Sequence, residues 1–178
     1  NVIEGVDLGN TTGWSITPKT SDQLFWVGGT GMWNDPANWS FTSGGPGGAC
    51  VPTAGDDVIF DANSFNNNGQ VVMVNVENAF CRSMIWDNPT GVPVLLGTEE
   101  KQIHFYGDLQ LSADMDYRFQ GDLYFESLNQ DTRIRTSGHE PAKDVYFRSI
   151  TGGWVLDDPF RIVNDIYFQS GSWNTNDQ

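Results

Sequence analysis

Short stretches in which apolar and polar residues alternate recur along most of the chain. Examples are DVIF at residues 57–60, DLYF at 122–125 and DVYF at 144–147, each followed closely by turn-favouring residues such as Ser, Asn or Asp. Alternation with a period of two is typical of β-strands that bury one face. Because apolar residues recur at helical spacing over no stretch of three turns, the sequence predicts an all-β protein. Its single helix-start signal is NDPANW, in which Asp35 would cap one turn that begins at Pro36.

One strand form repeats: an Asp, an aliphatic residue, any residue, then Phe or Leu. It occurs at 107–111 (GDLQL), 121–125 (GDLYF), 143–147 (KDVYF) and 164–168 (NDIYF), with looser matches at 56–60 (DDVIF) and 82–86 (RSMIW). The aspartates at 108, 122, 144 and 165 are 14, 22 and 21 residues apart. A unit of about 20 residues with two or three short strands indicates a solenoid, because a four-stranded propeller blade needs about 40 residues.

A parallel β-helix explains why the same residue types recur. Each coil would lay its strand on that of the coil before, about 4.8 Å away, so that equivalent side chains stack. The period of two then gives two interior ladders and one outward row: Leu123, Val145 and Ile166; Phe125, Phe147 and Phe168; and, pointing outward, Tyr124, Tyr146 and Tyr167. The alternative is a β-sandwich of meandering strands, which does not require the same residue types at the same step.

The stretch FWVGGTGMWNDPANWS at residues 25–40 places Trp26, Trp33 and Trp39 among glycines. The first coil of a β-helix exposes apolar interior and unpaired strand edges, which need a cover. A glycine-rich turn can lie flat on that coil while the three indoles fill its end. We therefore interpret residues 24–55 as an N-terminal cap and residues 56–178 as solenoid coils. The alternative is a carbohydrate platform built from one or two of these tryptophans.

The charge of the chain narrows the choice of partners. Its 178 residues include 9 Lys and Arg against 23 Asp and Glu, a formal net charge of −14. This balance argues against nucleic acid and against insertion at an anionic membrane surface, because both need clustered basic residues. No apolar run approaches the roughly 18 residues of a membrane-spanning helix. The composition fits an exported protein, in which case we expect its signal sequence upstream of this chain.

The two cysteines, Cys50 and Cys81, leave two alternatives open. In an exported protein they could form one disulfide that closes a loop of about 30 residues. They could equally be two separate thiols, one in a loop and one packed in the core.

A candidate calcium site lies in GDDVIFDANSFNNNG at residues 55–69. Asp56, Asp57, Asp61 and Asn63 supply the hard oxygen ligands that Ca²⁺ prefers. The spacing matches neither an EF-hand nor a nonapeptide calcium repeat. Asn-rich turns also form the corners of solenoids without any metal, which is the alternative interpretation.

Signs of catalysis are weak. No G-x-S-x-G motif occurs, His104 is expected on the outer side of its strand, and His139 falls in the turn SGHEP. Polysaccharide-cleaving β-helices use carboxylates, and adjacent pairs occur here at 56–57, 99–100 and 157–158. Neighbours on a strand point to opposite faces, however, so such pairs are more typical of solvated corners. We expect no catalytic residues and no cofactor other than calcium.

The runs WVGGTGMWNDPANWS, SGGPGGACVPTAGDDVIFDANSF and VNVENAFCRSMIW, with the later GDLYF and GGWVLDDPFRI coils, resemble a repeated module. It is found in large secreted adhesin-like surface proteins of gliding and biofilm-forming bacteria, similar in style to autotransporter passenger regions. The resemblance covers about residues 24–177. It implies a right-handed parallel β-helix, display on the bacterial cell surface and no assigned catalysis. Residues 1–23 would then be the tail of a preceding module or a linker, and the coils would be truncated at their C-terminal end.

These observations lead to one expected function and two alternatives. We expect a non-catalytic structural or adhesive module that forms a stiff stalk. Its partners would be neighbouring modules of the same chain, and surface glycans or another cell. The first alternative is a carbohydrate-binding module that uses the outward Tyr124, Tyr146 and Tyr167. The second is a fragment of a polysaccharide-degrading β-helix enzyme.

Overall fold

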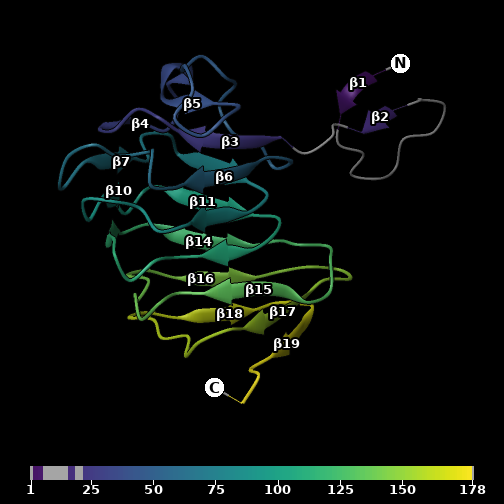
Figure 1. Cartoon of the computed structure of the whole chain (residues 1–178). Helices are drawn as coiled ribbons and strands as arrows, with labels where there is room; N and C mark the ends of the chain where they lie inside the picture. Colours follow the sequence, from purple (N-terminus) through teal and green to yellow (C-terminus); the bar gives the residue numbers. More distant parts are fainter. Residues whose placement is uncertain (1, 6–15, 19–21, 178) are drawn as a thin grey trace.

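The chain is a parallel β-solenoid of about five turns in the computed structural model, which describes residues 2–5, 16–18 and 22–177. The coils stack along one axis, from β3 at one end to β19 at the other (Figure 1). Among the described strands, every pairing is parallel except that of β3 with β5. This confirms the predicted all-β solenoid, and the alternative β-sandwich is wrong. No helix in the described ranges is long and apolar enough to cross a membrane.

Three sheets form the faces of the solenoid, and each contains strands from successive coils. The eight-stranded sheet consists of β3 (Gln23–Trp26), β5 (Trp39–Ser40), β6 (Asp57–Phe60), β9 (Met84–Trp86), β12 (Leu109–Gln110), β15 (Thr132–Arg135), β17 (Gly153–Leu156) and β19 (Ser172–Asn174). The five-stranded sheet consists of β8 (Asn78–Cys81), β11 (Gln102–Phe105), β14 (Asp122–Phe125), β16 (Val145–Phe147) and β18 (Ile166–Phe168). The four-stranded sheet consists of β4 (Gly31–Met32), β7 (Val71–Met73), β10 (Val94–Gly97) and β13 (Asp116–Phe119). A separate pair joins β1 (Val2–Gly5) and β2 (Ile16–Pro18).

The repeated strand form is used on two of these faces. The matches at 56–60, 82–86 and 107–111 lie in the eight-stranded sheet, as β6, β9 and β12. The matches at 121–125, 143–147 and 164–168 lie in the five-stranded sheet, as β14, β16 and β18. The 14-residue step between Asp108 and Asp122 therefore leads from the eight-stranded sheet past β13, on the four-stranded sheet, to the five-stranded sheet. True coil lengths follow from the register in the five-stranded sheet: Ile103 pairs with Leu123, 20 residues on, and Leu123 with Val145, 22 residues on.

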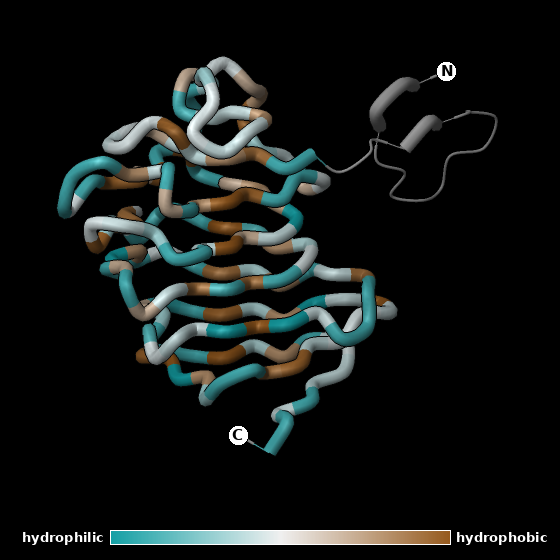
Figure 2. Tube along the Cα trace, viewed as in Figure 1, coloured by the Kyte–Doolittle hydropathy of each residue, from teal (hydrophilic) through white to brown (hydrophobic). Residues whose placement is uncertain are grey.

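The core is a set of ladders that run along the solenoid axis. On the eight-stranded sheet one ladder consists of Leu24, Val58, Met84, Leu109, Ile134 and Leu156, all at most 4% exposed. Figure 2 shows the same order as short hydrophobic segments that recur in successive coils between hydrophilic corners. The coils approach closely at their corners: a Cβ on Gly121 would lie 1.9 Å from the carbonyl oxygen of Lys101. Glycine is therefore required there.

The last coils close their third side without a strand. FRIV at residues 160–163 alternates apolar and polar residues, which predicts a strand, but the segment is irregular. Phe160 and Ile162 still pack against the core. The ring of Phe160 meets Phe147 edge-on, with centroids 6.0 Å apart. The alternating pattern here reflects the burial of the side chains of Phe160 and Ile162. The backbone of this segment forms no strand pairing, because the four-stranded sheet ends at β13.

The structure describes only part of the predicted N-terminal tail. Of the predicted tail 1–23, residues 1, 6–15 and 19–21 lie outside the described residues.

The predicted helical turn is confirmed as a 3-10 turn, η1 (Pro36–Asn38). Asp35 caps it, because its Oδ1 accepts a hydrogen bond of 2.9 Å from the backbone N–H of Ala37. Pro36 occupies the first position of the turn, where its missing N–H costs no hydrogen bond.

Candidate interaction surface on the five-stranded sheet

The outer face of the five-stranded sheet carries the most regular arrangement of functional groups in the described chain. Its strands pair in the predicted register, with Leu123 beside Val145 and Val145 beside Ile166. The intervening tyrosines point outward, and Tyr146 pairs directly with both Tyr124 and Tyr167. The predicted register is therefore confirmed. Within the ladders only the members on β18 are exposed, because no described strand pairs with the far edge of β18.

The tyrosines belong to a longer stack of rings, which we call the aromatic column: Phe80, His104, Tyr124, Tyr146 and Tyr167. Successive ring centroids are 4.9, 4.6, 4.5 and 4.9 Å apart, and the last three pairs are within 10° of parallel. The coil spacing dictates this geometry, since aligned parallel strands place equivalent side chains about 4.8 Å apart. His104 points outward as predicted, but its neighbours in the column leave it only 7% exposed.

One network of polar groups flanks the aromatic column. Glu126 lies beside His104, with 2.9 Å between Oε2 and Nδ1, and it accepts a hydrogen bond of 2.6 Å from Nε of Arg148. The other ring nitrogen of His104 lies 3.2 Å from Oδ1 of Asn78. Arg148 also covers the ring of Tyr124 at 4.6 Å, which is cation–π geometry. The network therefore ties four coils together on the outside of the sheet.

The opposite flank of the aromatic column is acidic. Asp122 is the first residue of β14, and Asp144 and Asp165 lie just before β16 and β18. Oδ1 of Asp122 lies 3.5 Å from Nζ of Lys143 without a well-formed hydrogen bond. Asp144 accepts a hydrogen bond from the side chain of Asn164. These carboxylates stand at the corners, as the repeat predicts, and they hold successive corners together.

Three groups on this face, Glu126, Tyr106 and Tyr146, have pKa values that are shifted from their ordinary values. Burial disfavours the charged form of Glu126, but hydrogen bonds from His104, Arg148 and Tyr106 outweigh it and lower the pKa of Glu126 to about 2. Burial, followed by the nearby charge of Glu126, raises the pKa of Tyr106 to about 12. Burial, followed by the charge of Asp144, raises the pKa of Tyr146 to about 12. These three groups hold one protonation state around neutral pH, which suits fixed structural contacts.

The stacking decides what the aromatic column can bind. A sugar ring packs on the face of an aromatic side chain, but the faces of Tyr124 and Tyr146 are covered by their neighbours in the column. Only ring edges and hydroxyl groups are presented along its length. The two end members, Phe80 and Tyr167, are 37% and 42% exposed. The geometry therefore suits edge contacts along the axis and stacking at an end.

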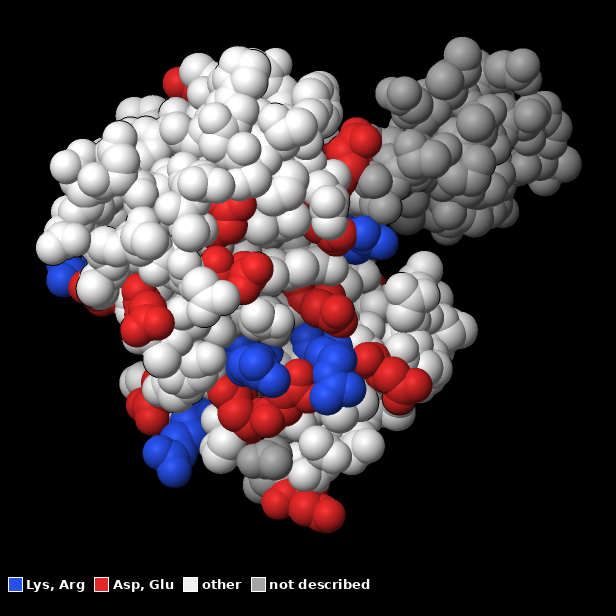
Figure 3. All heavy atoms as spheres, viewed as in Figure 1, with Lys and Arg blue, Asp and Glu red and all other residues white. Residues whose placement is uncertain are grey.

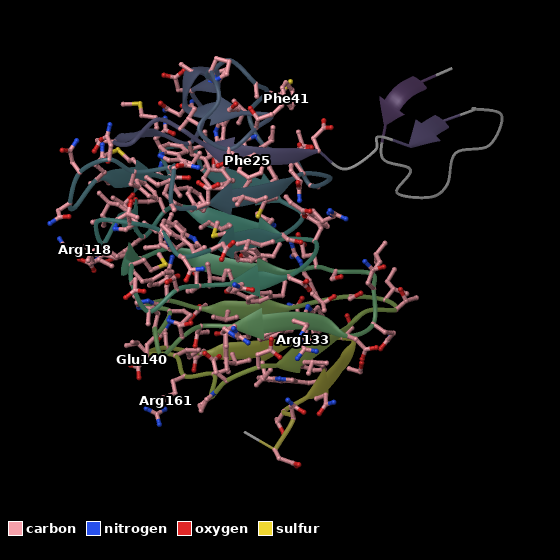
Figure 4. All side chains as sticks on the ribbon, in the orientation of Figure 1. Phe25, Phe41, Arg118, Arg133, Glu140 and Arg161 are labelled. Carbon is pink, nitrogen blue, oxygen red and sulfur yellow. The ribbon has the colours of Figure 1, made fainter. Side chains whose placement is uncertain are left out.

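The outer face of the eight-stranded sheet carries ion pairs between coils. Arg82 makes a two-pronged contact with Asp57, including a hydrogen bond of 2.8 Å from Nε. Arg133 contacts Asp157 in the same way, with 3.0 Å between Nε and Oδ2. Figure 3 shows basic and acidic side chains interleaved on this side of the molecule, and Figure 4 places Arg133 over β15. Pairing of this kind limits the net positive charge that these arginines present to a partner.

The three tryptophans of the glycine-rich segment are all at most 1% exposed. Trp39 lies between the other two, with ring centroids 5.0 Å from Trp26 and 5.1 Å from Trp33, both edge-on. Its indole N–H donates to the carbonyl oxygen of Trp33 at 2.8 Å. Trp26 and Trp39 both reach Phe60, on the next strand of the sheet. Such burial leaves no face of these indoles for a carbohydrate, so the platform alternative lacks geometric support.

Cys50 and Cys81, for which the sequence left a disulfide and two separate thiols open, are both free in this structure. Cys50 lies exposed in the loop that follows the tryptophans, whereas Cys81 is buried on β8. The side chain of Cys81 points into the core because it pairs with Phe105 at an interior position of the ladder. The two thiols therefore face different environments, which agrees with the alternative of two separate cysteines.

The four calcium candidates are occupied by partners within the protein. Asp56 accepts hydrogen bonds from the backbone N–H and the hydroxyl of Thr53, at 2.9 and 2.7 Å. Asp57 binds Arg82, and Oδ1 of Asp61 accepts a hydrogen bond of 2.9 Å from the backbone N–H of Asn63. Among the described residues, no group of three or more His, Cys, Asp or Glu side chains is arranged to hold a metal ion. These contacts support the corner interpretation of the segment.

The side chains of two further candidates for catalysis, His139 and Asp158, contact backbone groups. Nε2 of His139 lies 2.9 Å from the carbonyl oxygen of Ser112. Asp158 accepts hydrogen bonds from the backbone N–H groups of Thr136 and Ser137, at 2.9 and 2.5 Å. Its neighbour Asp157 binds Arg133 instead, so this adjacent carboxylate pair is divided between two roles.

The stack that includes His104 was missed by sequence reasoning, because Phe80 and His104 do not share the residue type of the tyrosines.

Comparison with known proteins does not add a family. No protein-family model, no curated protein and no solved structure matches this chain. The parallel β-solenoid is shown by the structure itself, and the resemblance to adhesin-like surface proteins stays an expectation from the sequence.

Proposed function

We propose that the chain is a non-catalytic structural and adhesive module of a large, secreted cell-surface protein, in which the solenoid forms a stiff stalk. The observation that carries this proposal is the continuity of stacking along the axis. The interior ladder that contains Phe125 and Phe147 and the aromatic column outside it run side by side through the same coils. A structure of this kind transmits force and holds its two ends at a fixed separation.

Stiffness follows from the way in which the coils are joined. Bending would have to open backbone hydrogen bonds between parallel strands, on three faces in the first coils and on two in the last, together with the ladders inside and outside them. Ion pairs between coils, such as Arg82 with Asp57, add resistance on the outer surface. The net charge of −14 disfavours non-specific association with nucleic acid and other polyanions. These features support a spacer that stays extended in solution.

The two alternatives receive less support from the geometry. A carbohydrate-binding module would need exposed ring faces, and those of Tyr124 and Tyr146 are occupied within the column. A polysaccharide-degrading enzyme would need a pair of carboxylates poised as acid and base. Glu126 instead lies within hydrogen-bond distance of His104 and accepts a hydrogen bond from Arg148, and its low pKa keeps it from acting as an acid near neutral pH.

Bead adhesion under flow tests the proposal. Beads that carry the chain would be passed over bacterial cells, a chain-coated surface, a glycan panel and bare glass, and retention would be measured against beads with an inert protein of similar charge. The purified chain would also be incubated with polysaccharides. We expect retention on cells or on the chain-coated surface, with no release of sugars from the polysaccharides. Retention equal to that of the inert protein would overturn the adhesive role. Polysaccharide turnover by the purified chain would favour the enzyme alternative.

A further inference from the structure

The turn before β7 contains the one asparagine of the sequence that is followed by a glycine, Asn68 before Gly69. Both residues are exposed, and Gly69 has a φ of 68°, which glycine adopts without strain. A Cβ on Gly69 would meet no atom within 4 Å, so the space around this peptide unit is open. The side chain of Asn68 therefore has unhindered access to the peptide unit that follows it.

The other asparagines of this turn differ from Asn68 in their hydrogen bonds. The side-chain amide of Asn67 donates to Oδ1 of Asn66 at 2.7 Å, and that of Asn63 donates to the hydroxyl of Ser43 at 2.9 Å. No described residue makes a hydrogen bond with the side chain of Asn68. Asn68 thus combines a side-chain amide that is not held in place with a glycine as its successor.

The backbone nitrogen of Gly69 is held by the next coil. Its N–H donates to the carbonyl oxygen of Gly91 at 2.8 Å, in the turn before β10, which lies beside the turn before β7 (Figure 1). A Cβ on Gly91 would lie 2.7 Å from the carbonyl oxygen of Asn67, so the two turns touch backbone to backbone. The hydroxyl of Thr90 fastens this contact, because it donates to the carbonyl oxygen of Phe65 at 2.9 Å.

We propose that Asn68 is a site of spontaneous deamidation, and that the hydrogen bond from Gly69 to Gly91 keeps it unreactive while the two turns stay together. In the reaction, the backbone nitrogen of Gly69 loses its proton to water or hydroxide and attacks Cγ of Asn68. The bond from Cγ to Nδ2 breaks, the side-chain nitrogen leaves as ammonia, and a cyclic succinimide remains. Water then opens the ring at either of its two carbonyl carbons, which gives aspartate or isoaspartate at this position.

The hydrogen bond to Gly91 opposes the first step. The attack requires that the nitrogen of Gly69 give up its proton and that its peptide plane turn toward Cγ of Asn68, and a nitrogen that donates to the next coil is free to do neither. The reaction therefore starts from states in which the two turns have separated. Local openings of this kind cost less free energy than global unfolding. The rate of deamidation thus measures how often the two turns separate.

Either product changes this corner of the solenoid irreversibly. Asn68 and Arg118 line one hollow of about 410 Å³ on the outer face of the four-stranded sheet, and both products place a new carboxylate there. Isoaspartate also adds a carbon atom to the backbone before Gly69. The N–H groups of Asn66 and Asn67 both donate to Oε1 of Gln70 across this point, at 2.7 and 2.9 Å. A longer backbone between these donors and their acceptor would disrupt the turn.

Peptide mapping by mass spectrometry tests the site. In denaturant at mildly alkaline pH, Asn68 should be converted faster than Asn66 and Asn67, and isoaspartate should appear with aspartate because both come from one succinimide. Gly69→Ala should slow the conversion in denaturant, where backbone strain plays no part, because a methyl group hinders the attack. In native buffer at the same pH and temperature, conversion in the wild-type chain should be slower by roughly tenfold or more.

Thr90→Val tests the protecting contact. Conversion of Asn68 in native buffer should accelerate by roughly 2- to 10-fold, the effect of one lost hydrogen bond on an opening equilibrium, with the rate in denaturant unchanged. The exchange of the Gly69 amide with solvent should accelerate in parallel, because both rates depend on the same opening. Thr151→Val is the matched control, since the hydroxyl of Thr151 makes an equivalent contact at another corner, with the carbonyl oxygen of Leu128 at 3.0 Å. It should leave the rate at Asn68 unchanged.

Three results would overturn the proposal. Conversion of Asn68 no faster than that of Asn67 in denaturant would reject the site. Equal rates in native buffer and in denaturant would reject protection by the fold. A Thr90→Val chain that converts Asn68 at the wild-type rate in native buffer, or at the same raised rate as Thr151→Val, would reject the contact between the two turns as the cause.

Discussion

Phe147 lies on Phe125 with their ring centroids 4.9 Å apart and their planes 9° from parallel. Both side chains are completely buried, and they come from equivalent positions of consecutive coils. One residue earlier, Tyr146 lies on Tyr124 in the same way, but on the outside of the sheet. The two pairs make the inside and the outside of the solenoid directly comparable by mutation.

Phe147→Ala should destabilise the protein much more than Tyr146→Ala. Truncation of Phe147 opens a cavity between coils and should lower the free energy of unfolding by about 3 to 5 kcal/mol. Truncation of Tyr146 removes only outer stacking contacts, for an expected loss of about 1 to 2 kcal/mol. Denaturant titrations of the two variants measure the difference. If Tyr146→Ala were the more damaging, the assignment of inner and outer faces would be reversed.

Trp33→Ala should destabilise the capped end of the solenoid. The side chain is 1% exposed and its ring packs edge-on against that of Trp39, with centroids 5.1 Å apart, so its loss leaves a large cavity beside a second indole. We expect a loss of about 3 to 5 kcal/mol in the free energy of unfolding. Phe41→Ala is the matched control, because that ring is 57% exposed in the same segment. Equal melting temperatures for the two variants would contradict a role of Trp33 in closing the core.

Acid should weaken the folded state through Glu126. Its pKa is about 2 in the folded chain against an ordinary value of 4.5, so the folded state favours the ionised form. The resulting stabilisation is fully present above about pH 4.5 and is lost as the pH falls toward 2. Glu126→Gln should be less stable than the wild type at neutral pH, and the gap should narrow in acid. A gap that widens below pH 4.5 would show that the sign is wrong.

The two thiols should differ in reactivity. Burial, followed by the nearby charges of Asp57 and Asp56, raises the pKa of Cys81 well above its usual value, so its thiol stays protonated and covered. Cys50 is exposed. Brief alkylation of the native protein without reductant should therefore add one label, at Cys50, and alkylation in denaturant should add two. A native mass lower by two hydrogens, with no label, would instead reveal a disulfide.

Much of the solenoid could be predicted from sequence, because equivalent positions of successive coils stack and therefore need similar residue types. Leu123, Val145 and Ile166 occupy one position in three strands, and their residue types alone placed them in one ladder with the correct register. The caps and turns were equally local: Asp35 followed by Pro36 predicted η1 without reference to the rest of the chain. Where a contact lies between neighbours in sequence, or between equivalent positions of a repeat, the pattern carries the information.

Contacts between unlike positions were decided only by the tertiary structure. The sequence did not show that GDLQL and GDLYF stand on different faces, because both satisfy the same alternation and only the path of the chain around the corner separates them. It did not place His104 in a stack with Tyr124, nor bring Arg148 over that ring, since these residues share no type or short spacing. The fate of Cys50 and Cys81 also depended on distance and direction in space. The sequence by itself determined which side chains alternate inward, because the period of two is a property of the strand. Which faces meet, and how the three tryptophans pack against one another over the first coil, followed from how the coils pack.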